Sequence, residues 1–291
     1  MSYYITTDSC SDVSKHFIEK FGSKNFAIAP ITYVVNGQLY DIENTKLDEK
    51  TFYNMMRDNA TISTSLINTF SAEIFFKGIL EQGFDIIHLS FSSGISGTFE
   101  SVTVAANNLK KEFPDRKIVV IDSKLASLGL GLLFYYTLKK RDSGASFEQC
   151  AEYATNLSSK INAIFIVDDL KHLQKTGRVS KAEAFIGTAL QIKPILHMDD
   201  AGKLIPVFKT VSKKKALKLL AEKTNEKISI KENEMIFISH GDSEEDAKYL
   251  SNYINDTLKL DCFIDYISPT IGAHSGPGTI AIFFIAQSRA L

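Results

Sequence analysis

Short apolar runs alternate with amphipathic stretches along the first half of the chain. Short runs rich in aromatic, aliphatic and β-branched residues, which predict buried strands, occupy residues 3–7, 84–89 and 117–121. Apolar residues spaced three and four apart predict helices over residues 12–22, 48–56, 72–80, 99–109, 126–138 and 146–159. Strands that alternate with helices are typical of a mainly parallel sheet covered by helices. The first half therefore predicts an α/β domain.

The segments on either side of the second of these helices have a different pattern. Residues 26–35 are predicted to be extended, and Asn36-Gly37 is a strong hairpin turn into a strand over Gln38–Ile42. Residues 61–65 form a polar stretch that predicts no element.

The second half mixes hairpins with helices. Its predicted strands cover residues 161–167, 192–198, 203–208, 234–239, 262–267 and 278–286. Its predicted helices cover residues 168–175, 182–190, 213–222 and 243–258. This order predicts an α+β domain on an antiparallel or mixed sheet. We place the two domains at 1–160 and 161–291 and expect them to pack tightly, because no Gly/Pro/Ser linker separates them.

Composition excludes several classes of protein. A hydrophobic share of 44% with a net charge of −1 is typical of a soluble globular protein without a nucleic-acid partner. The three cysteines lie far apart and the histidines show no ligand spacing, so neither a metal site nor another cofactor is expected. No apolar run is long enough to span a membrane and no signal peptide is evident. We expect a cytoplasmic protein.

The loop Ser90–Thr98 is the first candidate for chemistry. It joins a predicted strand to a predicted helix, and a helix start offers unpaired N–H groups and a partial positive charge. The hydroxyls of Ser92, Ser93, Ser96 and Thr98 lie in the same loop. Such a loop can hold a phosphate or a carboxylate. It can equally be an ordinary turn in which serines cap the helix.

Polar residues follow two more strands, at Asp8-Ser9 and Asp122-Ser123. The carboxyl ends of parallel strands share one edge of a sheet, so these residues should lie close to the Ser90–Thr98 loop. The helix after Ser123 contains Gly129 and Gly131, which lower its propensity by about 1 kcal/mol each. Close approach of another backbone or of a ligand would explain them, as would helix–helix packing.

A serine hydrolase is one alternative. Residues 94–98 approach the G-x-S-x-G nucleophile motif around Ser96, but Thr98 replaces the second glycine. Asp122 with His240 or His274 would complete a triad in the hydrolase order. The chain has no dinucleotide fingerprint and no P-loop, which argues against a nucleotide-binding site.

Two prolines and three glycines in residues 269–278 predict a tightly turning loop before the last strand, with His274 inside it. A histidine in such a loop is often structural, but it can also donate a hydrogen bond to an anion.

Five segments together resemble the DegV family of bacterial fatty-acid-binding proteins, and the resemblance covers almost the whole chain in order. They are Thr64-Ser65, Ser93-Gly94-Ile95-Ser96-Gly97-Thr98, Thr176-Gly177-Arg178, Lys193-Pro194-Ile195-Leu196 and Ile271-Gly272-Ala273-His274-Ser275-Gly276-Pro277-Gly278. The resemblance implies an α/β first domain and an α+β second domain, with one long-chain fatty acid such as palmitate or oleate buried between them.

The resemblance also implies roles for single residues. Thr64 and Ser96 correspond to the residues that bind the carboxylate, and His274 to the histidine beside it. Ser93 and the backbone of Gly97 belong to the same head-group loop. Arg178 is the matched candidate for a phosphoryl or partner contact at the edge of the second domain.

A non-catalytic carrier of fatty acids follows from this resemblance, with functions in lipid transport and fatty acid metabolism. In some members the carrier presents the carboxylate to a separate ATP-dependent fatty acid kinase subunit. The chain departs from the family at Leu66-Ile67-Asn68, where Gln-Pro-Ser is usual, and at Thr176, where glycine is usual. Val211 replaces an arginine of many relatives.

The residues themselves are consistent with a buried carboxylate and an acyl chain. Hydroxyls, loop N–H groups and a helix start can hold a carboxylate without a buried cation. The chain has 20 phenylalanines, and those near the proposed loops are Phe70, Phe75, Phe76, Phe91, Phe165, Phe185, Phe283 and Phe284. A serine esterase on acyl substrates and a regulatory protein that senses lipid remain the two alternatives.

Overall fold

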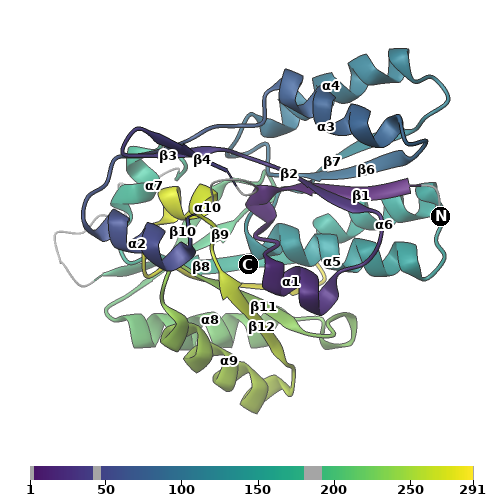
Figure 1. The fold of residues 1–291 in the computed structure, drawn as a ribbon. Helices are drawn as coiled ribbons and strands as arrows, with labels where there is room; N and C mark the ends of the chain where they lie inside the picture. The colour runs from purple at the N-terminus through teal and green to yellow at the C-terminus, as the bar shows by residue number, and fades with distance from the viewer. Residues whose placement is uncertain (1–2, 42–46, 180–191, 291) are drawn as a thin grey trace.

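The structure is a computed structural model that describes residues 3–41, 47–179 and 192–290 (Figure 1). The predicted helix over 182–190 and Ile42 at the end of the predicted hairpin lie outside these residues. The described chain forms an α/β fold with three sheets.

The first sheet is parallel throughout, as the sequence predicts. Its strands lie in the order β2-β1-β6-β7. Their bounds are Phe26–Ala29 (β2), Tyr3–Asp8 (β1), Asp85–Ser90 (β6) and Ile118–Asp122 (β7). The carboxyl ends of β1, β6 and β7 meet at one edge: the Phe91 N–H donates to Asp8 (2.7 Å) and the Ser93 N–H to Asp122 (3.2 Å).

The second sheet is mixed and has the order β10-β9-β8-β13-β11-β12. Its strands are Leu204–Thr210 (β10), Lys193–Met198 (β9), Ile161–Ile166 (β8), Ile280–Ile285 (β13), Ile236–His240 (β11) and Cys262–Tyr266 (β12). All its neighbours are antiparallel except β11 and β12, which are parallel. Both faces are covered, and alternate residues of β8 and β13 contribute to two different apolar cores. The predicted domain division at residue 160 stays a prediction.

A small third sheet, in the order β4-β3-β5, corrects the prediction for residues 26–65. Its strands are Gln38–Tyr40 (β4), Tyr33–Val35 (β3) and Ile62–Thr64 (β5). The predicted extended run at 26–35 is two strands in different sheets, since the chain leaves the first sheet after Ala29 at Pro30. The polar stretch at 61–65 pairs with β3 despite its composition, because its backbone completes the ladder of that strand.

Helix α5 (Leu128–Asp142) lies between the two large sheets. It contacts β1 and β6 of the first sheet and β8, β11 and β13 of the second. Every residue from Leu128 to Leu138 is buried. A helix that is apolar all round can be stable only in such a position.

The remaining helices cover the outer faces or join the sheets (Figure 1). They are Lys15–Phe21 (α1), Glu49–Arg57 (α2), Thr69–Leu80 (α3), Thr98–Glu112 (α4), Phe147–Ser158 (α6), Lys171–Lys175 (α7), Lys213–Lys227 (α8), Glu244–Leu258 (α9) and Pro269–Ser275 (α10). No helix among the described residues is both long and apolar enough to cross a membrane.

Helix α10 corrects the prediction of a loop over 269–278. Proline is favourable at the first position of a helix, and Pro269 takes that place. The helix ends where Gly276 (φ 82°) and Gly278 (φ 79°) adopt a conformation that other residues avoid. His274 is therefore presented from a helix and not from a turn.

The glycines of α5 allow close packing on both sides. A Cβ on Gly131 would lie 2.7 Å from the Ser11 carbonyl oxygen, and one on Gly129 would lie 2.8 Å from the Phe283 ring. Gly78 of α3 is also helical, but a Cβ there would meet nothing within 4 Å.

We predict opposite effects of alanine at these two kinds of position. Gly131→Ala should destabilise the protein by about 1–3 kcal/mol, because overpacking exceeds the gain in helix propensity. Gly78→Ala should stabilise it by about 0.5–1 kcal/mol. Urea denaturation of the two variants measures both. An unchanged or raised midpoint for Gly131→Ala would show that α5 does not need the close approach.

Candidate functional site

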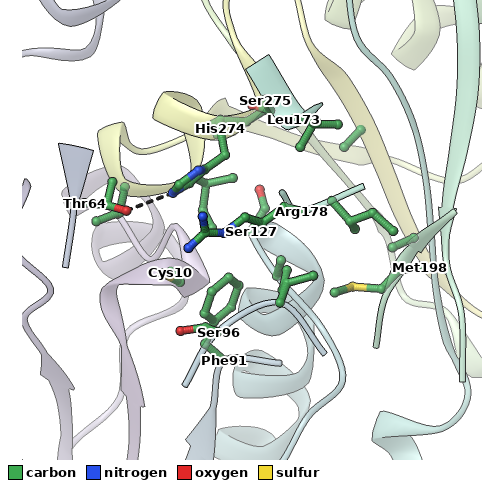
Figure 2. A pocket seen from close by; sticks show the side chains of 18 of the residues that line it. Cys10, Thr64, Phe91, Ser96, Ser127, Leu173, Arg178, Met198, His274 and Ser275 are labelled. Carbon is green, nitrogen blue, oxygen red and sulfur yellow. Dashed lines mark hydrogen bonds between the residues drawn. The ribbon is translucent and has the colours of Figure 1, made fainter. Parts of the chain in front are cut away.

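A cavity of about 200 Å³ lies between the two large sheets, beside the first residues of α5. This volume is many times what one buried water needs. Most of its lining is apolar, with Phe91, Phe165 and Phe283 among the side chains. Hydroxyls, an imidazole and a guanidinium gather toward one end, and Met198 lies toward the other (Figure 2).

Thr64 and His274 meet at the polar end from opposite parts of the chain. Thr64 is the last residue of β5, and its Oγ1 lies 2.8 Å from Nε2 of His274 on α10. Burial, with a further contribution from the nearby Arg178 charge, lowers the pKa of His274 to about 4. The imidazole is therefore neutral at neutral pH. With its proton on Nε2 it donates to Thr64, which leaves the threonine hydroxyl proton available for a ligand.

Ser96 lines the same end of the cavity, directly before α4. Its Oγ lies 3.0 Å from Thr98 Oγ1 and accepts a hydrogen bond from the Thr98 N–H (3.2 Å). Gly97 is the N-cap of α4 and has no side chain, and the Ser96 hydroxyl caps the N–H of the first helical residue instead. A Cβ on Gly97 would lie 3.3 Å from Leu66. The ordinary turn in which a serine caps the helix is thus present, and the anion cradle stays a prediction.

Arg178, which we predicted at the edge of the second domain, is half-buried and lines the cavity between the two large sheets. Figure 2 shows its side chain directed into the cavity, toward the end that holds His274, Thr64 and Ser96. Its guanidinium donates to the Thr176 carbonyl. No Asp or Glu lines the cavity among the described residues, so the polar end carries a positive charge.

Ser93 and Ser92 have other partners. The Ser93 hydroxyl accepts a hydrogen bond from Lys124 (2.6 Å), and the Ser92 hydroxyl donates to the Gly202 carbonyl (2.8 Å). Neither residue is among the described residues that line the cavity. They fix the loop that carries Ser96. A direct contact of Ser93 with a ligand stays a prediction.

The hydrolase candidates do not come together. Burial opposes ionisation of Asp122, but hydrogen bonds from Lys124 and Ser93 outweigh it and hold its pKa below the usual value. His240 accepts a hydrogen bond from the Ser243 N–H (3.2 Å) and packs on Tyr266. Since His274 bonds to Thr64, Ser96 has no histidine as a hydrogen-bond partner among the described residues.

Sequence reasoning missed the wall of the cavity behind His274. Cys10, Ser127 and Thr270 line it. Ser127 has φ 55° and ψ −149°, a strained conformation for a residue other than glycine. Two buried carboxyls lie nearby, and burial raises the pKa of Asp8 and of Asp12 to about 7 each. Asp8 was predicted at this edge of the sheet, but nothing in the local pattern marks the other residues, because their neighbours come from distant segments.

The phenylalanines near the proposed loops have different positions. Phe91, Phe165 and Phe283 line the cavity, whereas Phe76 and Phe284 are buried outside its lining and Phe70 is 71% exposed. Phe75 is half-buried and Phe185 lies outside the described residues. In the part of the chain described, no three His, Cys, Asp or Glu residues are grouped so that they could hold a metal ion.

The whole chain has known relatives. A family model described as "Uncharacterised protein, DegV family" matches residues 2–287. A DegV domain-containing protein of Clostridium perfringens is 35% identical over 288 residues, which are 99% of this chain and 98% of that protein.

The chain belongs to the DegV family. Two solved DegV structures show the same fold. DegV of Bacillus subtilis, described as a fatty acid binding protein, is 28% identical with a TM-score of 0.82 and covers 99% of this chain and 100% of its own. A fatty acid binding DegV family protein of Streptococcus agalactiae is 26% identical with a TM-score of 0.84 and covers the same shares. The predicted family and α/β fold class are thus confirmed.

Proposed function

We propose that this DegV protein binds one long-chain fatty acid in the cavity, with the carboxylate at Thr64 and Ser96. One observation carries the proposal: an apolar cavity has hydroxyls, a neutral imidazole and a cation together at one end. A fatty acid has the same distribution of polarity. The fatty-acid binding of the Bacillus and Streptococcus relatives supports it.

The carboxylate needs compensation for its loss of hydration. The threonine and serine hydroxyls and the Gly97 N–H at the start of α4 supply donors, each worth roughly 1.5–3 kcal/mol to a charged acceptor. Arg178 adds the cation that the sequence did not lead us to expect, and a buried charge is tolerated when it is paired. The acyl chain contributes most of the affinity, at roughly 0.8 kcal/mol for each buried methylene.

We further propose that the protein presents the bound carboxylate to a separate ATP-dependent kinase subunit or transports the lipid within the cytoplasm. His274 and Arg178 would then face the incoming phosphoryl group, whose negative charge requires donors or cations. Val211, in place of the family arginine, is 57% exposed and so available to a partner surface. A lipid-sensing regulator would use the same cavity without a kinase. The protein itself performs no catalysis under either proposal.

The first test of binding is the lipid content of purified protein. We expect about one long-chain fatty acid per chain in a solvent extract measured by mass spectrometry, because an empty apolar cavity forfeits packing energy. The delipidated protein should take up palmitate or oleate again in a calorimetric titration. A preparation that neither contains nor takes up either acid would contradict the proposal.

The second test concerns the head group. Thr64→Ala and Ser96→Ala should each weaken binding by about 1–3 kcal/mol, and together by less than the sum, because both hydroxyls meet one carboxylate. Ser159→Ala on the exposed end of α6 is the matched control. Ser93→Ala should have a smaller effect if Ser93 only supports the loop. If wild-type protein hydrolysed a nitrophenyl ester and Ser96→Ala lost that activity, the esterase alternative would be correct.

The third test concerns the kinase. His274→Ala and Arg178→Ala should lower acyl-phosphate formation with a cognate kinase subunit and ATP more than they lower fatty-acid affinity, since the product carries more negative charge than the acid. Arg116→Ala, whose arginine lies away from the cavity, is the control. Val211→Arg should raise acyl-phosphate formation if the family arginine contributes to docking of the kinase subunit. Equal losses of binding and phosphorylation would assign both residues to ligand binding alone.

A further inference from the structure

Asp12 lies behind the wall of the cavity, where its hydrogen bonds connect three segments of the chain. It is 4% exposed, and it is not among the described residues that line the cavity. Its Oδ1 accepts the Ser268 N–H (3.0 Å), and its Oδ2 accepts the Ser127 hydroxyl. Ser127 in turn lies 2.9 Å from Ser239 Oγ at the end of β11. One carboxylate thus connects the segment after β1, the start of α5 and the segment before α10.

The hydrogen bond to Ser268 affects the polar end of the cavity. Ser268 is the N-cap of α10, a helix of seven residues that ends one residue after His274. Tyr53 confines the helix on its other side. Its hydroxyl donates to the Ile267 carbonyl (3.0 Å), and it would clash with a Cβ on Gly272. Because so short a helix moves as a unit, the position of its N-cap sets the position of the His274 ring.

The bond to Ser127 fixes the facing wall. The strained backbone of Ser127 persists only if its surroundings over-determine it. Its N–H donates to the Cys10 carbonyl (2.7 Å), and its hydroxyl is shared between Asp12 and Ser239. Residues held in this way are commonly found at ligand clamps.

We infer that Asp12 is a positioning residue for the ligand carboxylate: it fixes the start of α10 and thereby sets His274 Nε2 against Thr64. The inference rests on the proposed function for its ligand, but the geometry it concerns can be measured without one. Asp12 itself touches no ligand.

The test is a matched pair of variants at Ser268. Its backbone has φ −62° and ψ 157°, which proline adopts without strain. Ser268→Pro and Ser268→Ala both remove the hydroxyl, which lies 3.0 Å from Thr270 Oγ1 and also hydrogen-bonds to Asp12, but only proline removes the N–H that Asp12 accepts. We expect at least tenfold weaker palmitate binding for Ser268→Pro and less than threefold for Ser268→Ala. In a His274→Ala background, Ser268→Pro should weaken binding by less than a further twofold.

A ligand-free measurement separates the two proposals. In protein labelled with ¹⁵N at histidine, the His274 imidazole resonances, assigned by their loss in His274→Ala, should shift in Ser268→Pro and stay in Ser268→Ala. If Ser268→Pro does not fold, Asp12→Gly replaces it, since glycine adopts the φ of 53° at this position freely. Asp12→Asn, which keeps an acceptor oxygen, should then restore binding and the resonances.

Three outcomes would overturn the inference. The two Ser268 variants could lower palmitate affinity equally, or the loss of affinity in Ser268→Pro could add fully to that in His274→Ala. The third outcome is that the His274 imidazole resonances do not change in Ser268→Pro. If wild-type protein failed to bind palmitate while the resonances shifted as expected, the proposed function would be wrong and the positioning role of Asp12 would stand.

Discussion

The packing of α5 between two sheets is the constraint on which the rest of the structure depends. A helix in which every residue from Leu128 to Leu138 is buried cannot remain at the surface of either sheet, so both sheets must cover it. Gly129 and Gly131 let a side chain of β13 and the backbone at Ser11 approach closely. The first turn of the helix then lies beside the cavity, and Ala126 and Ser127 before it form part of the cavity wall.

The polar end of the cavity combines groups that differ in how they carry charge. His274 is half-buried and neutral, so it contributes a directed hydrogen bond and no cation. Arg178 supplies the positive charge, and no carboxylate of the described residues lines the cavity to neutralise it. A ligand with one negative end and a long apolar body is complementary to this arrangement. Under the proposed function, such a site binds the acid by desolvation and charge pairing.

Much of the fold could be predicted from local patterns. The strands β1, β6 and β7 are rich in aromatic, aliphatic and β-branched residues, and buried parallel strands have that composition. The convergence of Asp8, the Ser90–Thr98 loop and Asp122 followed from a general property of parallel sheets. The errors arose where local composition and tertiary pairing disagree. Residues 62–64 are polar and still form a strand, and residues 269–275 contain Pro and Gly and still form a helix.

The candidate site also contains features that local sequence predicts and features that depend on tertiary contacts. Ser96, Gly97 and the helix start they precede are neighbours in sequence, so the sequence by itself determined that this loop could hold an anion. The family resemblance added Thr64 and His274. Only the tertiary structure decided that Arg178 points into the cavity and that Ser93 and Ser92 support the loop. It alone also decided that Asp12, in the segment after β1, bonds to the start of α10 over 256 residues. The physical reason is the separation along the chain of the residues that interact. Hydrogen bonding at a helix start depends on adjacent residues, whereas the burial and pairing of a charge depend on segments that only the folded chain brings together.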